Sequence, residues 1–325
     1  MNAKIFPFGH NSGGLLRPHE ESHPRTHMSL YRCISPVMLL LSLALLQVGC
    51  APFKSTRVAA VAYTMQDVAD AAAKQSSLSV VREGTPAYLM LIDGLLEAYP
   101  DNADLLVAGC RAYSTYASSF LTDEQQEEAT ALYQKAKLYG FEALSRQRDF
   151  AAAAAGGNLD DFNALLRRFG KADVPALFCA AGAWASWISS NMDNLEALAD
   201  LTMLEATMKR LIELDGAYYY GGPHLLMGVY LAAKPAALGG NPAEAKKHFD
   251  EAFLLGADKL LGAKVLYARY YARSINDREL FVQTLQEVLA APADPVPELT
   301  LANVVAKKQA AALLTKTEEY FAKPQ

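Results

Sequence analysis

Residues 218–253 read YYYGGPHLLMGVYLAAKPAALGGNPAEAKKHFDEAF, and this stretch decides the fold. Its first half is apolar at helical spacing, its second half is amphipathic, and glycine and proline residues separate the two. Asn241, Pro242 and Glu244 are typical of a helix start, with asparagine at the N-cap, proline at the first helical position and glutamate at the third. The stretch therefore predicts two helices joined by a short turn.

This hairpin pattern recurs along the chain. A pattern of four residues recurs at an offset of 46 positions. The first copy consists of Gly182, Ala199, Met203 and Ala206, and the second consists of Gly228, Ala245, Phe249 and Ala252. A third copy with a longer insertion consists of Gly109, Ala129, Tyr133 and Ala136. A glycine lets a second helix approach, and the large residue between two alanines fills the gap, because positions i, i+4 and i+7 share one face. The spacing predicts degenerate tetratricopeptide-like (TPR-like) helical hairpins in a compact, irregular solenoid.

Almost every segment beyond residue 50 has helical spacing, and no alternating pattern typical of a strand persists. We therefore predict an all-α fold. Helices are expected at residues 56–77, 86–98, 103–120, 123–146, 161–169, 174–190, 193–214, 222–234, 242–255, 259–273, 277–290 and 297–321. Thr85–Pro86 is expected to begin the second of these, and residues 151–158 are expected to form a loop.

The composition narrows the possible functions. The 325 residues carry a net charge of −5 and contain no run of lysine or arginine, which argues against nucleic acid binding. Beyond residue 27 the only histidines are His224 and His248, and no catalytic, phosphate-binding or zinc-binding motif accompanies them. We expect no catalytic residue, no metal and no cofactor, so the protein is not expected to be an enzyme. A hydrolase hidden in the helical fold is the alternative.

The amino-terminal residues are typical of a bacterial lipoprotein signal. Two arginines precede an apolar stretch at 34–50 that is too short to span a membrane, and a small residue stands directly before Cys50. We expect cleavage before Cys50 and lipidation of that cysteine. Residues 1–49 are then an extension and signal peptide that are removed, and residues 50–325 form a single all-helical TPR-like domain anchored to a membrane.

Three points about this segment stay open. Gln47 departs from the usual lipoprotein pattern, so an ordinary secretory signal or an uncleaved anchor is an alternative. Residues 1–27 hold four of the six histidines and do not resemble a signal peptide, which favours a translation start at Met28 over Met1. The alternative is that these residues form a histidine-rich metal-binding tract. The residue after the lipidated cysteine is Ala51 rather than aspartate, which favours the outer membrane over the inner.

Two further cysteines, Cys110 and Cys179, lie in apolar helical stretches. An oxidising periplasm would permit a disulfide between them. Free cysteine, however, is often buried as a small hydrophobic residue. The sequence therefore favours two buried thiols.

The tyrosines and the histidine of the opening stretch raise the question of a binding site. Gly221, Gly222 and Pro223 fit the start of a helix. A helix start does not, however, explain the aromatic and polar side chains next to them. Core packing is the favoured interpretation, and a surface that faces a ligand or partner is the alternative. The candidate surface consists of Tyr218, Tyr219, Tyr220, His224, Lys234, Trp184 and Trp187. The two tryptophans share a helix face, where packing is again favoured over lining a cavity.

Four runs together resemble one family. They are VREGTPAYLMLIDGLLEAYPDN (81–102), FGKADVPALFCAAGAWASWI (169–188), the opening stretch, and AKVLYARYYARSINDRELFVQTLQEVLAAP (263–292). Over residues 80–320 the chain is similar to the T component of TRAP transporters (TatT), and the GGPH…PAALGG block is the most distinctive part.

The resemblance implies a periplasmic, TPR-containing lipoprotein that serves solute import. It implies binding to the solute-binding P component, self-association as a homotrimer, and a cavity near the repeats in which a small solute could be shared. The alternative is a TPR lipoprotein that scaffolds envelope assembly without a role in transport.

Overall fold

The computed structural model of the protein describes residues 51–321, and for residues 51–60, 123 and 146–148 it describes the backbone alone. Within 51–321 every regular element is a helix and no strand is present. The all-α prediction is therefore confirmed. Cys50 and the signal segment lie outside the described residues. Contacts assign Thr56–Gln325 to one compact unit.

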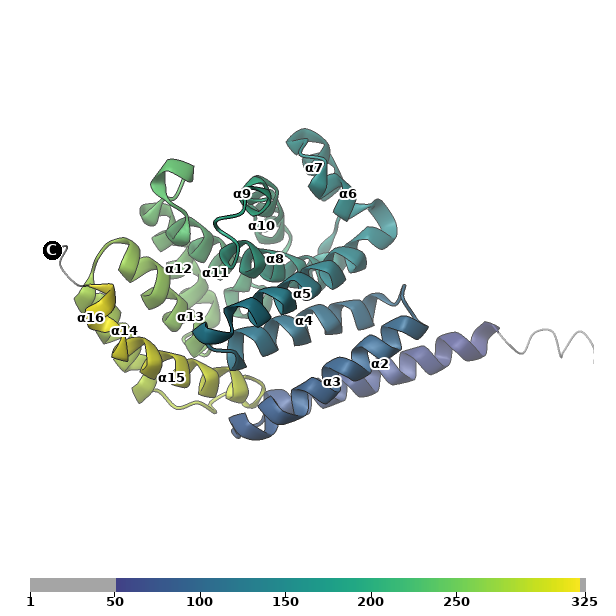
Figure 1. Ribbon diagram of the computed structural model, residues 1–325, viewed down its shortest axis with the longest axis horizontal. Coiled ribbons are helices and arrows are strands. Elements are labelled where there is room, and N and C mark those ends of the chain that lie inside the picture. Colours follow the sequence, from purple (N-terminus) through teal and green to yellow (C-terminus); the bar gives the residue numbers. More distant parts are fainter. Residues whose placement is uncertain (1–50, 322–325) are drawn as a thin grey trace, which may run out of the picture. The chain divides into compact units, whose positions relative to one another are not determined.

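Figure 1 shows the helices in chain order. The α-helices are α2 (Ala51–Ala73), α3 (Leu78–Ala98), α4 (Ala103–Phe120), α5 (Gln126–Arg148), α6 (Phe150–Ala155), α7 (Leu159–Leu166), α8 (Val174–Ser189), α9 (Leu195–Ala199), α10 (Leu201–Asp215), α11 (Tyr218–Ala233), α12 (Pro242–Gly256), α13 (Leu261–Leu266), α14 (Arg278–Ala290), α15 (Thr300–Thr315) and α16 (Thr317–Tyr320). The short 3-10 helices are η1 (Asp123–Gln125), η2 (Lys171–Asp173), η3 (Ala236–Leu238) and η5 (Pro297–Leu299), and η4 (Tyr267–Ala272) is a π-helix.

Two local predictions were wrong. Helix α3 begins at Leu78, so Pro86 lies inside it, where a proline costs one backbone hydrogen bond. Burial of Val81 supports the additional N-terminal turns. The expected loop at 151–158 is mostly helical, because alanine has the highest helix propensity and Phe150, which is fully buried, anchors helix α6.

The largest core cluster lies where helices α5, α8, α10 and α11 meet. Trp184 is fully buried there, and the rings of Phe141 and Phe150 pack edge-on against it at centroid distances of 4.9 and 6.5 Å. Gly140 permits this packing, because a Cβ at that position would lie 2.8 Å from the Cα of Ala180. Helices α5 and α8 therefore pack with almost no space between their backbones.

The large residue expected against the repeat glycine is found at one hairpin and not at the other two. A Cβ on Gly228 would meet the ring of Phe249 at 3.0 Å, as expected for helices α11 and α12. Next to Gly109 the ring is that of Tyr139 instead of the expected Tyr133. Around Gly182 no described atom lies within 4 Å of such a Cβ. Glycine spacing thus predicted the hairpins correctly but not all of their side-chain partners.

The last helices return to the first ones. A second core cluster joins helices α13, α14 and α15. Helix α15 also contacts helix α3, and the Gln309 amide donates a hydrogen bond to the Ser118 carbonyl at 2.9 Å. The chain of hairpins is therefore closed by contacts between residues 191 positions apart.

The expectation of two free thiols was wrong. Cys110 on helix α4 and Cys179 on helix α8 form a disulfide with a Cα–Cα distance of 6.3 Å. The sequence placed both cysteines on helices but gave no sign that these helices pack against each other. Helix α5 lies between them in the chain and packs against both.

Candidate functional site

Both tryptophans of the candidate surface belong to a structural network. The Trp184 indole N–H donates to the Asp200 carboxylate at 2.6 Å, and the ammonium of Lys137 pairs with the same carboxylate at 3.0 Å. That ammonium also lies 3.8 Å from the centre of the Trp187 ring. The network joins helix α5 to helix α8 and to the junction of helices α9 and α10, so these side chains hold the core together.

Lys234 is also engaged. Only 8% of its side chain is exposed, and its ammonium lies 2.8 Å from the Tyr230 hydroxyl and 3.3 Å from the Glu205 carboxylate. The Tyr230 hydroxyl donates to Glu205 at 2.8 Å. Burial would raise the pKa of Glu205, but hydrogen bonds from Lys209 and Tyr230 outweigh it, so the pKa is lowered. The group ties helix α11 to helix α10.

The three tyrosines form an unusual turn at the start of helix α11. Tyr219, Tyr220 and Gly221 have φ values of 45°, 60° and 79°, which lie in the left-handed region that tyrosine rarely adopts. The turn brings the backbone of Gly221 against Ala252 of helix α12, where a Cβ would lie 2.9 Å from the Ala252 Cα. The glycine was predicted from the sequence, but the two left-handed tyrosines were not.

The turn presents one ring to solvent. The Tyr218 ring packs edge-on against Phe178 at 5.3 Å, whereas Tyr219 remains 49% exposed beside Tyr220. Such strained, partly exposed positions are often found at functional sites.

The histidines face each other across the hairpin. Nδ1 of His224 on helix α11 lies 3.0 Å from Nδ1 of His248 on helix α12. His248 is partly buried against helix α11, although exposed charge pairs surround it on helix α12. Its spacing from Ala245 and Ala252 could have indicated the inward face. Burial lowers the pKa of both rings. At His224 the negative charge of Glu251 opposes this lowering. At His248 the other ring and Lys247 lower the pKa further, and the charge of Glu244 opposes them.

These shifts predict loss of stability in mild acid. Each folded-state pKa is below the ordinary value of 6.5, so the unfolded chain binds protons first. The stabilisation is present above about pH 6.5 and is lost as the pH falls towards the folded-state pKa. We expect the urea midpoint of residues 56–325 to fall more between about pH 8 and about pH 5.5 than that of the His224→Gln/His248→Gln variant. Equal falls would contradict this.

A groove lies between helices α4 and α8, away from most of the predicted surface. This groove, called the α4–α8 groove, has a volume of 480 Å³. Its lining residues are Gln66, Ala103, Asp104, Val107, Ala108, Arg111, Ala143, Leu144, Phe169, Ala172, Asp173, Pro175 and Ala176. Most are small or apolar, and Arg111 is the single cation among them. Sequence reasoning missed the groove because its walls are far apart along the chain.

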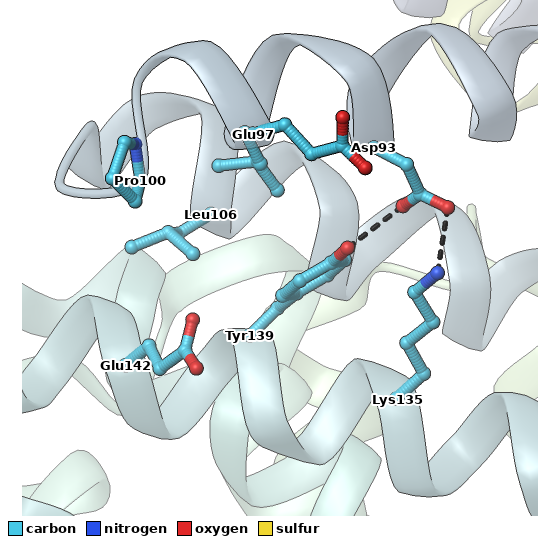
Figure 2. A pocket seen from close by; sticks show the side chains of 8 residues that line it. Asp93, Glu97, Pro100, Leu106, Lys135, Tyr139 and Glu142 are labelled. Carbon is cyan, nitrogen blue, oxygen red and sulfur yellow. Dashed lines mark hydrogen bonds and ion pairs between the residues drawn. The ribbon is translucent and has the colours of Figure 1, made fainter.

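A second cavity of 310 Å³ lies between helices α3 and α5 (Figure 2). Lys135 and Tyr139 both point to Asp93 there, with distances of 2.6 and 2.7 Å to its carboxylate. The Tyr113 hydroxyl donates to the same carboxylate at 2.7 Å. Burial would raise the pKa of Asp93, but these three hydrogen bonds lower it. Asp93 and its three partners thus join helices α3, α4 and α5, whereas Glu97 and Glu142 also line the cavity without belonging to this group.

Within residues 51–321, no cluster of three or more histidine, cysteine, aspartate or glutamate side chains could hold a metal ion. None of the helices described is both long enough and apolar enough to cross a membrane.

The fold and the cavities place the protein in a class of all-helical hairpin proteins that have grooves between their helices. Among known families, residues 74–321 match the one described as TRAP transporter T-component. The chain therefore belongs to the TRAP transporter T-component family, an accessory component of these transporters. A protein of Treponema pallidum (strain Nichols) named "Uncharacterized protein" is 22% identical over 265 residues, which cover 76% of this chain and 81% of the relative.

Proposed function

We propose that this protein is a lipid-anchored periplasmic scaffold of a TRAP-type import system that binds the solute-binding P component and a small solute. The observation that carries the proposal is the family match, which spans 74–321 and includes the tyrosine turn and every lining residue of the two cavities except Gln66. The lipoprotein features of residues 34–50 support anchoring through Cys50. The homotrimer and the absence of catalysis belong to the same proposal.

The surface around the tyrosine turn is suited to the partner. Tyr219 is exposed on one side of the turn, and the Leu255 Cβ lies 3.2 Å from the position of a Cβ on Gly221. Leu254, next in the chain, is 73% exposed. Exposed apolar residues that lie together mark interaction sites more often than isolated ones do. We call Tyr219, Tyr220, Leu254 and Leu255 the tyrosine–leucine surface.

Sedimentation velocity with the purified P component tests the proposal. The complex is expected with residues 56–325, and the Tyr219→Asn/Leu254→Ser variant is expected to bind at least about tenfold more weakly, because apolar anchors dominate such interfaces. Asparagine tolerates left-handed backbone, so the turn is kept. Leu195→Ser is the control, since Leu195 is 82% exposed on helix α9.

Three results would count against parts of the proposal. Absence of a complex would contradict the role in transport and favour envelope scaffolding. A monomer at micromolar concentration would contradict the homotrimer. Unchanged binding of the double variant would place the docking surface elsewhere.

A further inference from the structure

We propose a metal site that goes beyond the proposed function: the imidazoles of His224 and His248 bind one divalent cation of the first transition row between helices α11 and α12. Each ring contributes its Nδ1, the Glu251 carboxylate supplies a third ligand, and water fills the remaining positions. The site is argued from side-chain geometry, and it depends neither on the family match nor on the P component.

The separation of the two rings matches that of two ligands on one metal ion. The Nδ1 atoms lie 3.0 Å apart, and the ring centroids lie 5.2 Å apart at an interplanar angle of 37°. With metal–nitrogen distances of about 2.0–2.1 Å, two nitrogens at this separation enclose an angle of about 91–97° at the ion. Angles near a right angle are typical of tetragonal sites with nitrogen and oxygen ligands, which Cu²⁺ and Ni²⁺ prefer.

The packing of the hairpin holds both rings in this position. Nε2 of His224 faces the end of helix α10, where a Cβ on Gly216 would lie 2.8 Å from it. On helix α12 the residue after His248 is Phe249, whose ring closes against Gly228 of helix α11. The two helices therefore present the Nδ1 atoms to each other in advance, and little freedom is lost when an ion binds.

The protonation state of the rings is suited to coordination. In the structure one Nδ1–H donates to the other Nδ1. When an ion binds, the ring that carries this proton takes the tautomer protonated at Nε2, so both Nδ1 lone pairs are available and no net proton is released. Burial lowers the pKa of both rings, which keeps them neutral at pH 7, the form that binds metals.

The neighbouring charges favour a cation. Burial lowers the pKa of His224, and the negative charge of Glu251 on helix α12 opposes this, so the carboxylate lies near the ring. Glu251 forms no ion pair with a residue of the described part of the chain. Lys247 also acts on His248, but its ammonium is paired with Glu244 at 2.8 Å.

The two rings are the fixed ligands, and Glu251 is the movable one. Within residues 51–321 no three metal-binding side chains converge, so the Glu251 carboxylate reaches the ion only when its side chain rotates. This arrangement predicts that the two histidines contribute more to affinity than the glutamate does.

Isothermal titration calorimetry with Ni²⁺ tests the site on residues 56–325, purified without a histidine tag. One Ni²⁺ is expected to bind per chain, whereas Mg²⁺, which prefers oxygen ligands, is expected not to bind. His224→Gln and His248→Gln are each expected to weaken Ni²⁺ binding by at least about 10–100-fold, the loss that removal of an outer-shell partner already causes. Glu251→Gln is expected to weaken it less, because both rings remain.

A matched control and a second readout keep the test specific. Asp250→Asn removes a carboxylate next to Glu251 in the chain that pairs with Lys246, and it is expected to leave the Ni²⁺ affinity unchanged. Electron paramagnetic resonance of the original chain with one Cu²⁺ is expected to show hyperfine coupling to two imidazole nitrogens. This readout does not depend on the folding of any variant.

Four results would overturn the proposal. They are equal Ni²⁺ affinity of His248→Gln and the original chain, Mg²⁺ binding as tightly as Ni²⁺, no Ni²⁺ binding at millimolar concentration, and a Cu²⁺ spectrum with oxygen ligands alone. None of these measurements uses the P component, so the metal site and the proposed role in transport are tested separately.

Discussion

Replacing Phe249 by alanine is expected to lower the free energy of unfolding by about 3–5 kcal/mol, because the loss of a buried aromatic ring leaves a cavity. The Phe249 side chain is fully buried between helices α11 and α12. Its ring closes against Gly228, and its centroid lies 5.2 Å from the Tyr267 ring in an edge-on contact. No smaller side chain at this position fills the space that the glycine opens.

Urea denaturation of residues 56–325 measures this effect. Phe249→Leu keeps part of the apolar volume and is expected to cost less than Phe249→Ala. Leu254→Ala, on the exposed side of the same helix, is expected to change stability by less than about 0.5 kcal/mol. A loss below about 1 kcal/mol for Phe249→Ala would contradict the packing of this hairpin.

Removing the disulfide is expected to cost about 4 kcal/mol, because the bond closes a loop of 69 residues and so restricts the unfolded chain. The comparison is between the oxidised chain and the Cys110→Ala/Cys179→Ala variant, again by urea denaturation. Alanine keeps the apolar character of both positions. The loop includes helices α5, α6 and α7, which are therefore kept close to helix α8.

Reduction supplies the control for this prediction. A thiol reductant is expected to lower the stability of the original chain to near that of the double variant and to leave the variant unchanged. Equal stability of the oxidised and reduced chains would show that helices α4 and α8 are held by packing alone.

The helices were predictable from local sequence. The Asn241 side chain accepts the Glu244 backbone N–H at 3.2 Å, as its spacing before Pro242 indicates. The Asn102 side chain caps helix α4 in the same way at 2.9 Å. The closeness of helices α11 and α12 followed from Gly228 and Phe249. Helix caps depend on residues a few positions apart, and the glycine–phenylalanine contact follows from a regular spacing, so these features can be predicted from the sequence alone.

The site was less predictable, because its parts meet only through tertiary packing. Arg111 and Ala176 line one groove although they are far apart in the chain, and no periodic pattern links helix α4 to helix α8. Tyr219 stood out in the sequence, but its left-handed backbone did not; it lies two residues before Gly221, which packs closely against helix α12. Trp184 and Lys234 stood out as well, and both are used to stabilise the fold.

The central claim, that this T-component family member acts as an accessory of solute import, is tested most directly in its own cell envelope. The full chain is purified through a carboxy-terminal tag from detergent-solubilised envelopes, and the P component of the same cell is quantified by mass spectrometry. We predict that the P component is enriched with the original chain and much less with the Tyr219→Asn/Leu254→Ser variant. A chain recovered in full without the P component would contradict the account.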